Sequence, residues 1–140
     1  MLHLGAGYLL AGRVEGAHRL AERLLALSRD RKERGNQSWA LWLLGEIAAQ
    51  RHPPDAAQAE AHYRHALALA EELGMRPLVA HCHAGLGTLY TTTGRWKQAR
   101  AELSVAIALY RVMEMPFWLT QAEATLAQVL HATGSLGVSH

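Results

Sequence analysis

The chain has 140 residues, of which 50% are hydrophobic and 19% are charged. This length suits one domain with a single hydrophobic core, and this composition excludes an intrinsically disordered chain. The formal net charge is only +2, which is too small to drive binding to nucleic acid through the release of counterions. We therefore expect a folded protein that has no nucleic-acid partner.

The hydrophobic residues are mainly those that favour helices. Alanine occurs 25 times and leucine 23 times, whereas valine occurs 6 times, isoleucine 2 times and phenylalanine once. Alanine and leucine have high helix propensity, while β-branched and aromatic residues favour strands. The composition therefore predicts an all-α fold.

Several features predict a cytoplasmic protein without a membrane partner. Cys82 is the only cysteine, so the chain forms no internal disulfide, which fits a reducing compartment. The first ten residues lack a basic region and contain Gly5 and Gly7, so we expect no signal peptide. The longest stretch without Asp, Glu, Lys or Arg covers residues 77–94 and contains histidines, which favours a buried helix over a membrane span.

The sequence repeats itself with a period of about 40 residues. A Leu-Gly pair occurs at Gly5, Gly45 and Gly87, and a weaker copy ends at Ala127. A second pattern of mostly small residues with i, i+4, i+7 spacing follows each of the first three pairs, which places its members on one helical face. Its members are Ala17, Ala21 and Leu24, then Ala59, Tyr63 and Ala66, then Ala99, Leu103 and Ala106.

Glycines predict where the helices end, because glycine adopts the left-handed conformation that follows many helices. Those used here are Gly12, Gly35, Gly74, Gly94 and Gly134, with prolines near several helix starts. The pattern predicts about seven antiparallel helices, or three and a half helix pairs. Their approximate ranges are 1–11, 14–33, 37–51, 55–73, 77–93, 96–113 and 117–133.

These residues resemble the tetratricopeptide repeat (TPR), which has LGxxY on its first helix and small residues on its second. The third unit fits best, with Leu86, Gly87, Tyr90, Gly94, Ala99, Leu103 and Ala106 at the signature positions. The resemblance implies a TPR-like α-solenoid and a role in binding proteins or peptides. We expect a single repeat domain over 1–140, with units at about 1–35, 36–74, 75–115 and 116–134 and a tail at 135–140.

A narrower resemblance covers residues 74–123. This segment is similar to the carboxy-terminal repeat arrays of large bacterial signalling proteins, which join an ATPase module to a nucleotide cyclase or kinase domain. The resemblance implies a regulatory or scaffolding segment of a larger signalling protein. Its partner would then be another protein or another domain of the same polypeptide.

The first helix of each repeat has two faces with different expected roles. One face belongs to the core, with Leu41, Leu44, Ala48, His83, Leu86 and Tyr90. The other lines the concave groove in the family that the chain resembles. Its candidate contact residues are Trp39, Trp42, Glu46, His81, Thr88, Thr91, Gln121, Gln128 and His131. Trp39 and Trp42 would be the main anchors, because buried aromatic side chains dominate many interfaces. The alternative is that both rings pack in the core.

Neither catalysis nor metal binding is indicated. His81 and His83 point to different sides of a helix, so they do not converge on one ion with other ligands. Cys82 lacks a base that a third group could orient, and we expect a buried, inert thiol. The sequence contains no phosphate-binding motif, and the adjacent carboxylates Glu71 and Glu72 point to different sides of a helix and so would not face one pocket. We therefore expect no enzymatic activity, no metal and no cofactor.

A second function remains open, in which the chain is an architectural segment that associates with itself. The first predicted helix is short, and its Leu2, Leu4, Leu9 and Leu10 could lack a covering neighbour. The last helix is also unpaired in the predicted arrangement. Either end could bury its apolar face against a second copy, which would give a homodimer.

Overall fold

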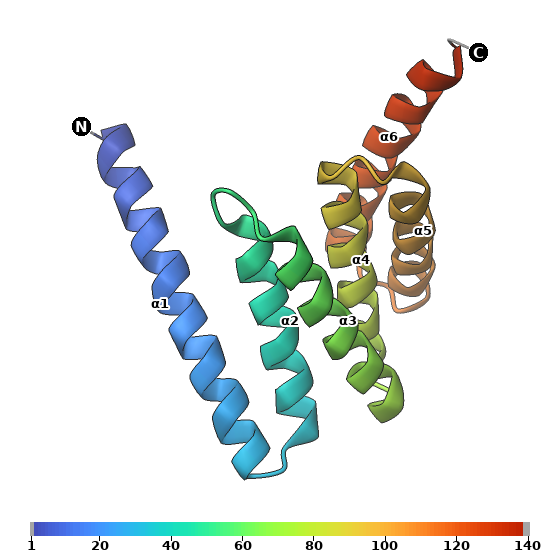
Figure 1. Cartoon of the computed structure of the whole chain (residues 1–140). Coiled ribbons are helices and arrows are strands. Elements are labelled where there is room, and N and C mark those ends of the chain that lie inside the picture. The colour runs from blue at the N-terminus through green and yellow to red at the C-terminus, as the bar shows by residue number, and fades with distance from the viewer. Residues whose placement is uncertain (1, 139–140) are drawn as a thin grey trace. The chain divides into compact units, whose positions relative to one another are not determined.

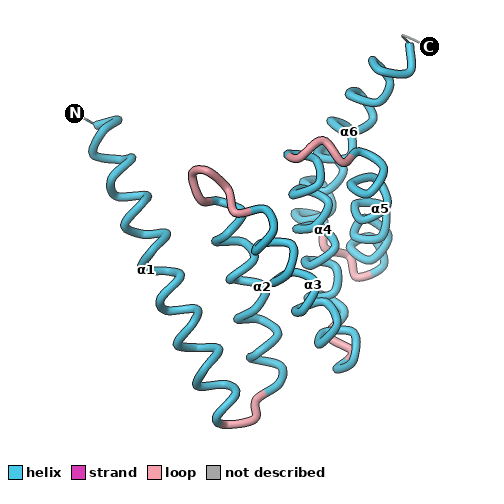
Figure 2. The backbone as a smooth tube through the Cα atoms, viewed as in Figure 1, coloured by secondary structure: helices cyan, strands magenta, loops and turns pink. Residues whose placement is uncertain are grey.

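The computed structural model describes the backbone of residues 2–138 and the side chains of residues 12–134. The described backbone forms six α-helices (Figure 1), joined by short loops and without a strand (Figure 2). This arrangement confirms the all-α, TPR-like fold, in which α1 packs on α2, and α5 packs on both α4 and α6. The helices are α1 (Leu2–Asp30), α2 (Arg34–Gln50), α3 (Ala56–Leu73), α4 (Arg76–Thr92), α5 (Trp96–Val112) and α6 (Pro116–Val138).

The first two predicted helices are one continuous helix, so the described residues form six helices rather than seven. Gly12 lies inside α1 and does not end a helix. One glycine costs a helix only about 0.5–1 kcal/mol, and no proline stands nearby to block the hydrogen bonds. Gly134 likewise lies inside α6, which continues to Val138, and Gly35 lies in the first turn of α2.

Four of the connections between the described helices are the same tight turn. In the turn after α4, the backbone N–H of Arg95 donates to the carbonyl of Tyr90 at 2.9 Å, and Gly94 has a positive φ of 75°. This is the Schellman arrangement that commonly ends a helix. The residues with positive φ in the four turns are Lys32, Gly74, Gly94 and Glu114. The turn glycines at 74 and 94 were predicted, whereas Lys32 and Glu114 occupy this position without being glycine.

The fifth connection, between α2 and α3, is different. It spans residues 51–55 and contains the cis peptide bond His52–Pro53. This longer loop contains the adjacent prolines Pro53 and Pro54. The four equal turns give the helices a common numbering. Lys32, Gly74 and Glu114 lie in the turns that follow α1, α3 and α5, respectively, and that precede α2, α4 and α6.

The described chain divides into two compact units, residues 1–69 and 70–140. In the first unit, α1 packs on α2, and Gly45 of α2 approaches the ring of Tyr63 of α3 so closely that a Cβ would lie 2.8 Å from its Cδ1 atom. The hydroxyl of Ser38 donates to the carbonyl of Ala66 at 2.9 Å, and Ser38 is fully buried. Steric fit and a buried hydrogen bond therefore fix α3 on α2.

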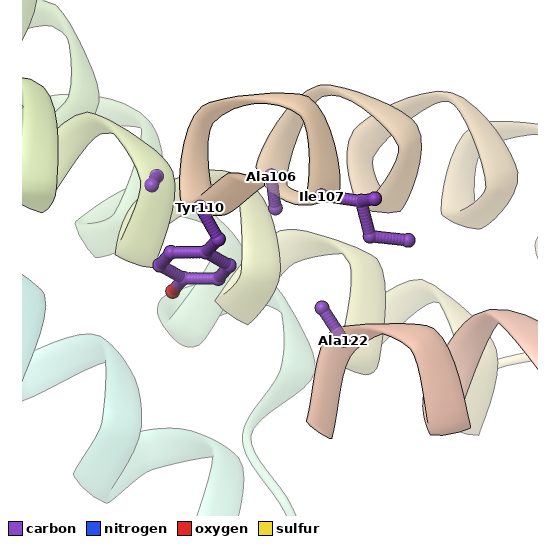
Figure 3. Packing of buried hydrophobic residues seen from close by; sticks show 5 residues of the cluster. Ala106, Ile107, Tyr110 and Ala122 are labelled. Carbon is purple, nitrogen blue, oxygen red and sulfur yellow. The ribbon is translucent and has the colours of Figure 1, made fainter. Parts of the chain in front are cut away.

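In the second unit, α5 packs between its neighbours, and α4 also contacts α6. Ala106, Ile107 and Tyr110 of α5 form a buried cluster with Ala122 of α6 (Figure 3). Of the predicted core residues in the two units, all except His83 are 3% exposed or less. His83 is half-buried, and its Nδ1 atom lies 3.0 Å from a carboxylate oxygen of Glu102.

Candidate functional site

A pocket of about 440 Å³ lies between α1 and α2 in the first unit. Its walls are mostly apolar, and its polar residues come from the end of α1 and the start of α2. A concave, largely apolar pocket with a few polar groups is typical of a binding site. The apolar residues are Leu24, Leu27, Trp39, Ala40, Trp42 and Leu43, and the polar residues are Ser28, Arg31, Glu33 and Asn36.

The two predicted anchors, Trp39 and Trp42, both line this pocket. They lie one turn apart on α2, and their rings meet edge to face with centroids 5.8 Å apart. Trp39 is 40% exposed, and Trp42 is half-buried. The two rings therefore pack against each other, and the ring of Trp39 remains accessible to a ligand.

Glu46 lies on the same side of α2, one turn beyond Trp42, but does not line the pocket. The hydroxyl of Tyr63 donates to its carboxylate. Burial raises the pKa of Glu46 above 4.5, and the hydrogen bond from Tyr63 partly offsets this effect. Glu46, a candidate contact residue, therefore also joins α2 to α3 through a hydrogen bond.

His81 is the candidate contact residue most involved in packing within the second unit. Its Nδ1 atom lies 2.6 Å from the hydroxyl of Tyr110, and its ring meets Trp118 edge to face with centroids 4.7 Å apart. Burial lowers the pKa of His81 below 6.5. The imidazole of His81 therefore links α4 to both α5 and α6.

The other candidate contact residues of the second unit are more open. Thr91 is half-buried, and its hydroxyl donates to the carbonyl of Gly87 in its own helix at 2.8 Å. The remaining four are exposed side chains on α4 and α6, namely Thr88, Gln121, Gln128 and His131. Three of the nine candidates therefore belong to the first unit and six to the second.

The open-end residues Leu2, Leu4, Leu9 and Leu10 have side chains outside the described residues. The structure instead shows three exposed leucines further along α1, which the sequence analysis missed. Leu20 is 55% exposed, Leu24 43% and Leu27 44%. The repeated pattern places Leu24 at the position of Ala66 and Ala106, which are both fully buried. Leu24 is exposed because, in the described residues, no helix covers this face of α1. The i, i+4, i+7 spacing of the three leucines is the sequence feature that indicates this apolar face.

No group of three His, Cys, Asp or Glu side chains that could hold a metal ion occurs among the described residues. Cys82 is fully buried in α4, as predicted. His81 and His83, its neighbours, make the contacts with Tyr110 and Glu102 described above. The histidines near the cysteine are therefore engaged in holding helices together.

Residues 54–111 match the family model of the tetratricopeptide repeat, which covers α3, α4 and nearly all of α5. Repeats of this family generally mediate protein–protein interactions. The matched segment is less than half of the chain. None of the curated proteins compared with the sequence matches it.

Among the described residues, no helix combines enough length with enough apolar character to cross a bilayer.

Proposed function

We propose that this chain is a non-catalytic protein-interaction module that binds a helical segment of a partner in the pocket between α1 and α2. The pocket, with the exposed Trp39 in its wall, is the observation that carries the proposal. Large, preordered aromatic side chains make strong interface anchors. The family match over residues 54–111 supports the same class of function.

The length of the apolar surface favours a helix over a small ligand. Leu20, Leu24 and Leu27 are exposed and follow one another along α1. Seven residues of helix extend about 10 Å, so a ligand that covers all three leucines must be elongated. An amphipathic helix in an apolar groove is a common way to recognise a protein segment.

The remaining candidate residues would then contribute at the edges. We assign Thr88, Gln121, Gln128 and His131 to polar contacts, because their side chains are exposed. Polar rim contacts generally add specificity more than affinity. Glu46, His81 and Thr91 already have hydrogen-bond partners within the chain, so they would mainly shape the surface.

The proposed biological setting is a regulatory or scaffolding segment of a larger bacterial signalling protein in the cytoplasm. The support is the resemblance of residues 74–123 to the repeat arrays of such proteins, together with the single, buried cysteine. The partner would then be another protein or another domain of the same polypeptide.

A peptide selection tests the binding function directly. A library of random peptides is selected on the wild-type chain and counter-selected on a chain with Leu24→Glu and Leu27→Glu. We expect enriched peptides with an apolar residue at every third or fourth position, because one helical face must fill the pocket. The substituted leucines are exposed, so circular dichroism and the melting temperature should remain close to the wild-type values.

The control is Val105→Glu, which changes a 42% exposed residue of α5 outside the pocket. It should bind the selected peptides as well as the wild type does. Peptides that bind the double variant equally well, or a selection that enriches none, would contradict the proposed function.

A further inference from the structure

The pocket occupies a position that a helix fills in the second unit. The residues of α1 and α5 correspond when they are counted back from Lys32 and Glu114, the left-handed residues that follow them. By this count the pocket residues Leu24, Leu27, Ser28 and Arg31 are equivalent to Ala106, Leu109, Tyr110 and Met113. These four residues, three in α5 and Met113 directly after it, all belong to the buried cluster of the second unit or pack against it.

In the second unit, α4 covers these residues. Ala80 of α4 belongs to the same cluster and Ala84 packs against it, and His81 contacts both Tyr110 and Trp118. The α2 side of the pocket includes Asn36. Counted from Lys32 and Glu114, Asn36 is equivalent to Trp118 of α6. The pair α1 and α2 thus corresponds to the pair α5 and α6. Within the described residues, the first unit has a pocket where the second unit has α4.

Burial at equivalent positions supports the same conclusion. Leu24 is 43% exposed, whereas its equivalents Ala66 in α3 and Ala106 in α5 are fully buried. Leu27 is 44% exposed, whereas Leu69 in α3 is 8% exposed. Helices α3 and α5 therefore bury a face that α1 leaves open to solvent.

Helix α6 likewise exposes residues whose equivalents in α2 and α4 are buried. Its residues correspond to those of α2 and α4 when counted from the preceding left-handed residue. Leu130 is 44% exposed, whereas its equivalents Ala48 and Tyr90 are each 1% exposed. Ala127 is exposed, whereas its equivalents Gly45 and Gly87 are buried. The open face of α6 is therefore the face that α4 uses to pack on α5.

We propose that α6 of one copy docks into the pocket of a second copy, where it completes a helix pair with α1. This inference rests on the proposed function, because it uses the same pocket and names its occupant. The contact joins two different surfaces, so each copy in a pair keeps one unused pocket or one unused α6. Contacts of this kind produce open chains or rings rather than closed dimers.

The sizes of the facing side chains fit this arrangement. In the pair of α4 and α5, Gly87 lies against Leu103, and Ala106 is one turn further along α5. In α1 this order is reversed, because Ala21 is equivalent to Leu103 and Leu24 is equivalent to Ala106. A docked α6 would place the small residue Ala127 at the position of Gly87. The pair of α4 and α5 and the proposed pair of α6 and α1 would each contain one leucine next to small residues. The total side-chain volume at the contact would therefore be nearly the same in both pairs.

The polar contacts can also be matched. His81 of α4 is hydrogen-bonded to Tyr110 of α5. By the same count, the equivalent residues are Gln121 of α6 and Ser28 of α1. The hydroxyl of Ser28 donates to the carbonyl of Leu24 at 2.6 Å. Its oxygen can still accept a hydrogen bond from an amide N–H, which the exposed Gln121 could supply.

Solution mass measured by light scattering over a range of concentrations tests the proposal on the whole chain. We expect the mass of the wild type to rise above that of a dimer as concentration increases. Leu24→Glu blocks the pocket, and Ala127→Glu blocks α6. Both positions are exposed in the single copy, so each variant should fold and remain monomeric. Val105→Glu, outside both surfaces, should assemble like the wild type.

Mixing the two monomeric variants gives the decisive result. The Leu24→Glu chain keeps an intact α6, and the Ala127→Glu chain keeps an intact pocket. We expect a 1:1 heterodimer that grows no further, because the remaining surfaces carry like charges. A wild type that stays monomeric, a single variant that still assembles, or a mixture that stays monomeric would overturn the inference. If peptides still bind the pocket in any of these cases, the proposed function stands and only its occupant is wrong.

Discussion

A Cβ atom on Gly87 would lie 2.5 Å from the Cγ atom of Leu103. Real Cβ atoms do not approach a neighbour so closely, so α4 and α5 can touch here only because position 87 carries no side chain. The backbone nitrogen of Leu103 would be 3.3 Å from the same Cβ, which leaves little room for the helix to shift. The contact explains why glycine follows leucine in the repeated Leu-Gly pair.

Gly87→Ala should therefore lower the free energy of unfolding by about 1–3 kcal/mol, as expected for an overpacked core. Urea denaturation measures this change. Adding Leu103→Ala should make the double variant more stable than the sum of the single effects predicts, because the two positions share one space. Gly16→Ala is the control, since its Cβ would be 3.9 Å from the nearest atom, in the side chain of Arg19. A neutral Gly87→Ala would refute the steric explanation.

Ser38→Ala tests the buried hydrogen bond between α2 and α3. The change removes the donor to the carbonyl of Ala66, and we expect it to cost about 1 kcal/mol of unfolding free energy. Ser104→Ala is a matched control, because that exposed hydroxyl donates only to Arg100 in its own helix. Equal effects of the two changes on urea denaturation would show that the bond from Ser38 adds no stability.

The sequence predicted the fold because small residues recur at the same helical positions. Gly45 and Gly87 face Tyr63 and Leu103 in the structure, which is the contact that a glycine at this spacing permits. Helix ends were harder to predict, because the turns depend on backbone hydrogen bonds that residues other than glycine can also complete. Lys32 ends α1 in this way.

The pocket was not predictable for a different reason. The residues at Leu24, Ala66 and Ala106 have the same spacing within their helices, but only the last two are buried in the structure. A local pattern reports which face of a helix is apolar, and it does not report whether a neighbour is present. For the same reason, the spacing of Trp39 and Trp42 placed both rings on one face without deciding their exposure.

Glu114→Gly should stabilise the chain. Glu114 has a positive φ of 54° in the turn after α5, a conformation that costs a residue with a side chain about 1 kcal/mol relative to glycine. The melting temperature should rise without any change in helix content. Arg100→Gly, in the middle of α5, should lower it, because glycine weakens a helix interior. A lower melting temperature for Glu114→Gly would contradict the assigned turn.

Glu46→Gln should stabilise the chain at neutral pH. Burial raises the pKa of Glu46 above 4.5, so its folded state favours the protonated form, and the stability that this form gives is lost as pH rises through the raised pKa. A neutral amide avoids that loss and still offers Tyr63 an oxygen acceptor. Urea denaturation should show the gain at neutral pH and little gain well below pH 4.5, where both side chains are uncharged. A constant difference at all pH values would exclude this cause.

His81 should make stability depend on pH in the opposite direction. Burial lowers the pKa of His81 below 6.5, so the unfolded chain takes up a proton first as pH falls, and the free energy of unfolding decreases below pH 6.5. His81→Gln should reduce this slope. Some slope should remain, because burial and the charges of His18 and His65 also lower the pKa of His62. Adding His62→Gln should flatten it further, and an unchanged slope in His81→Gln would show that burial of the His81 ring does not lower its pKa.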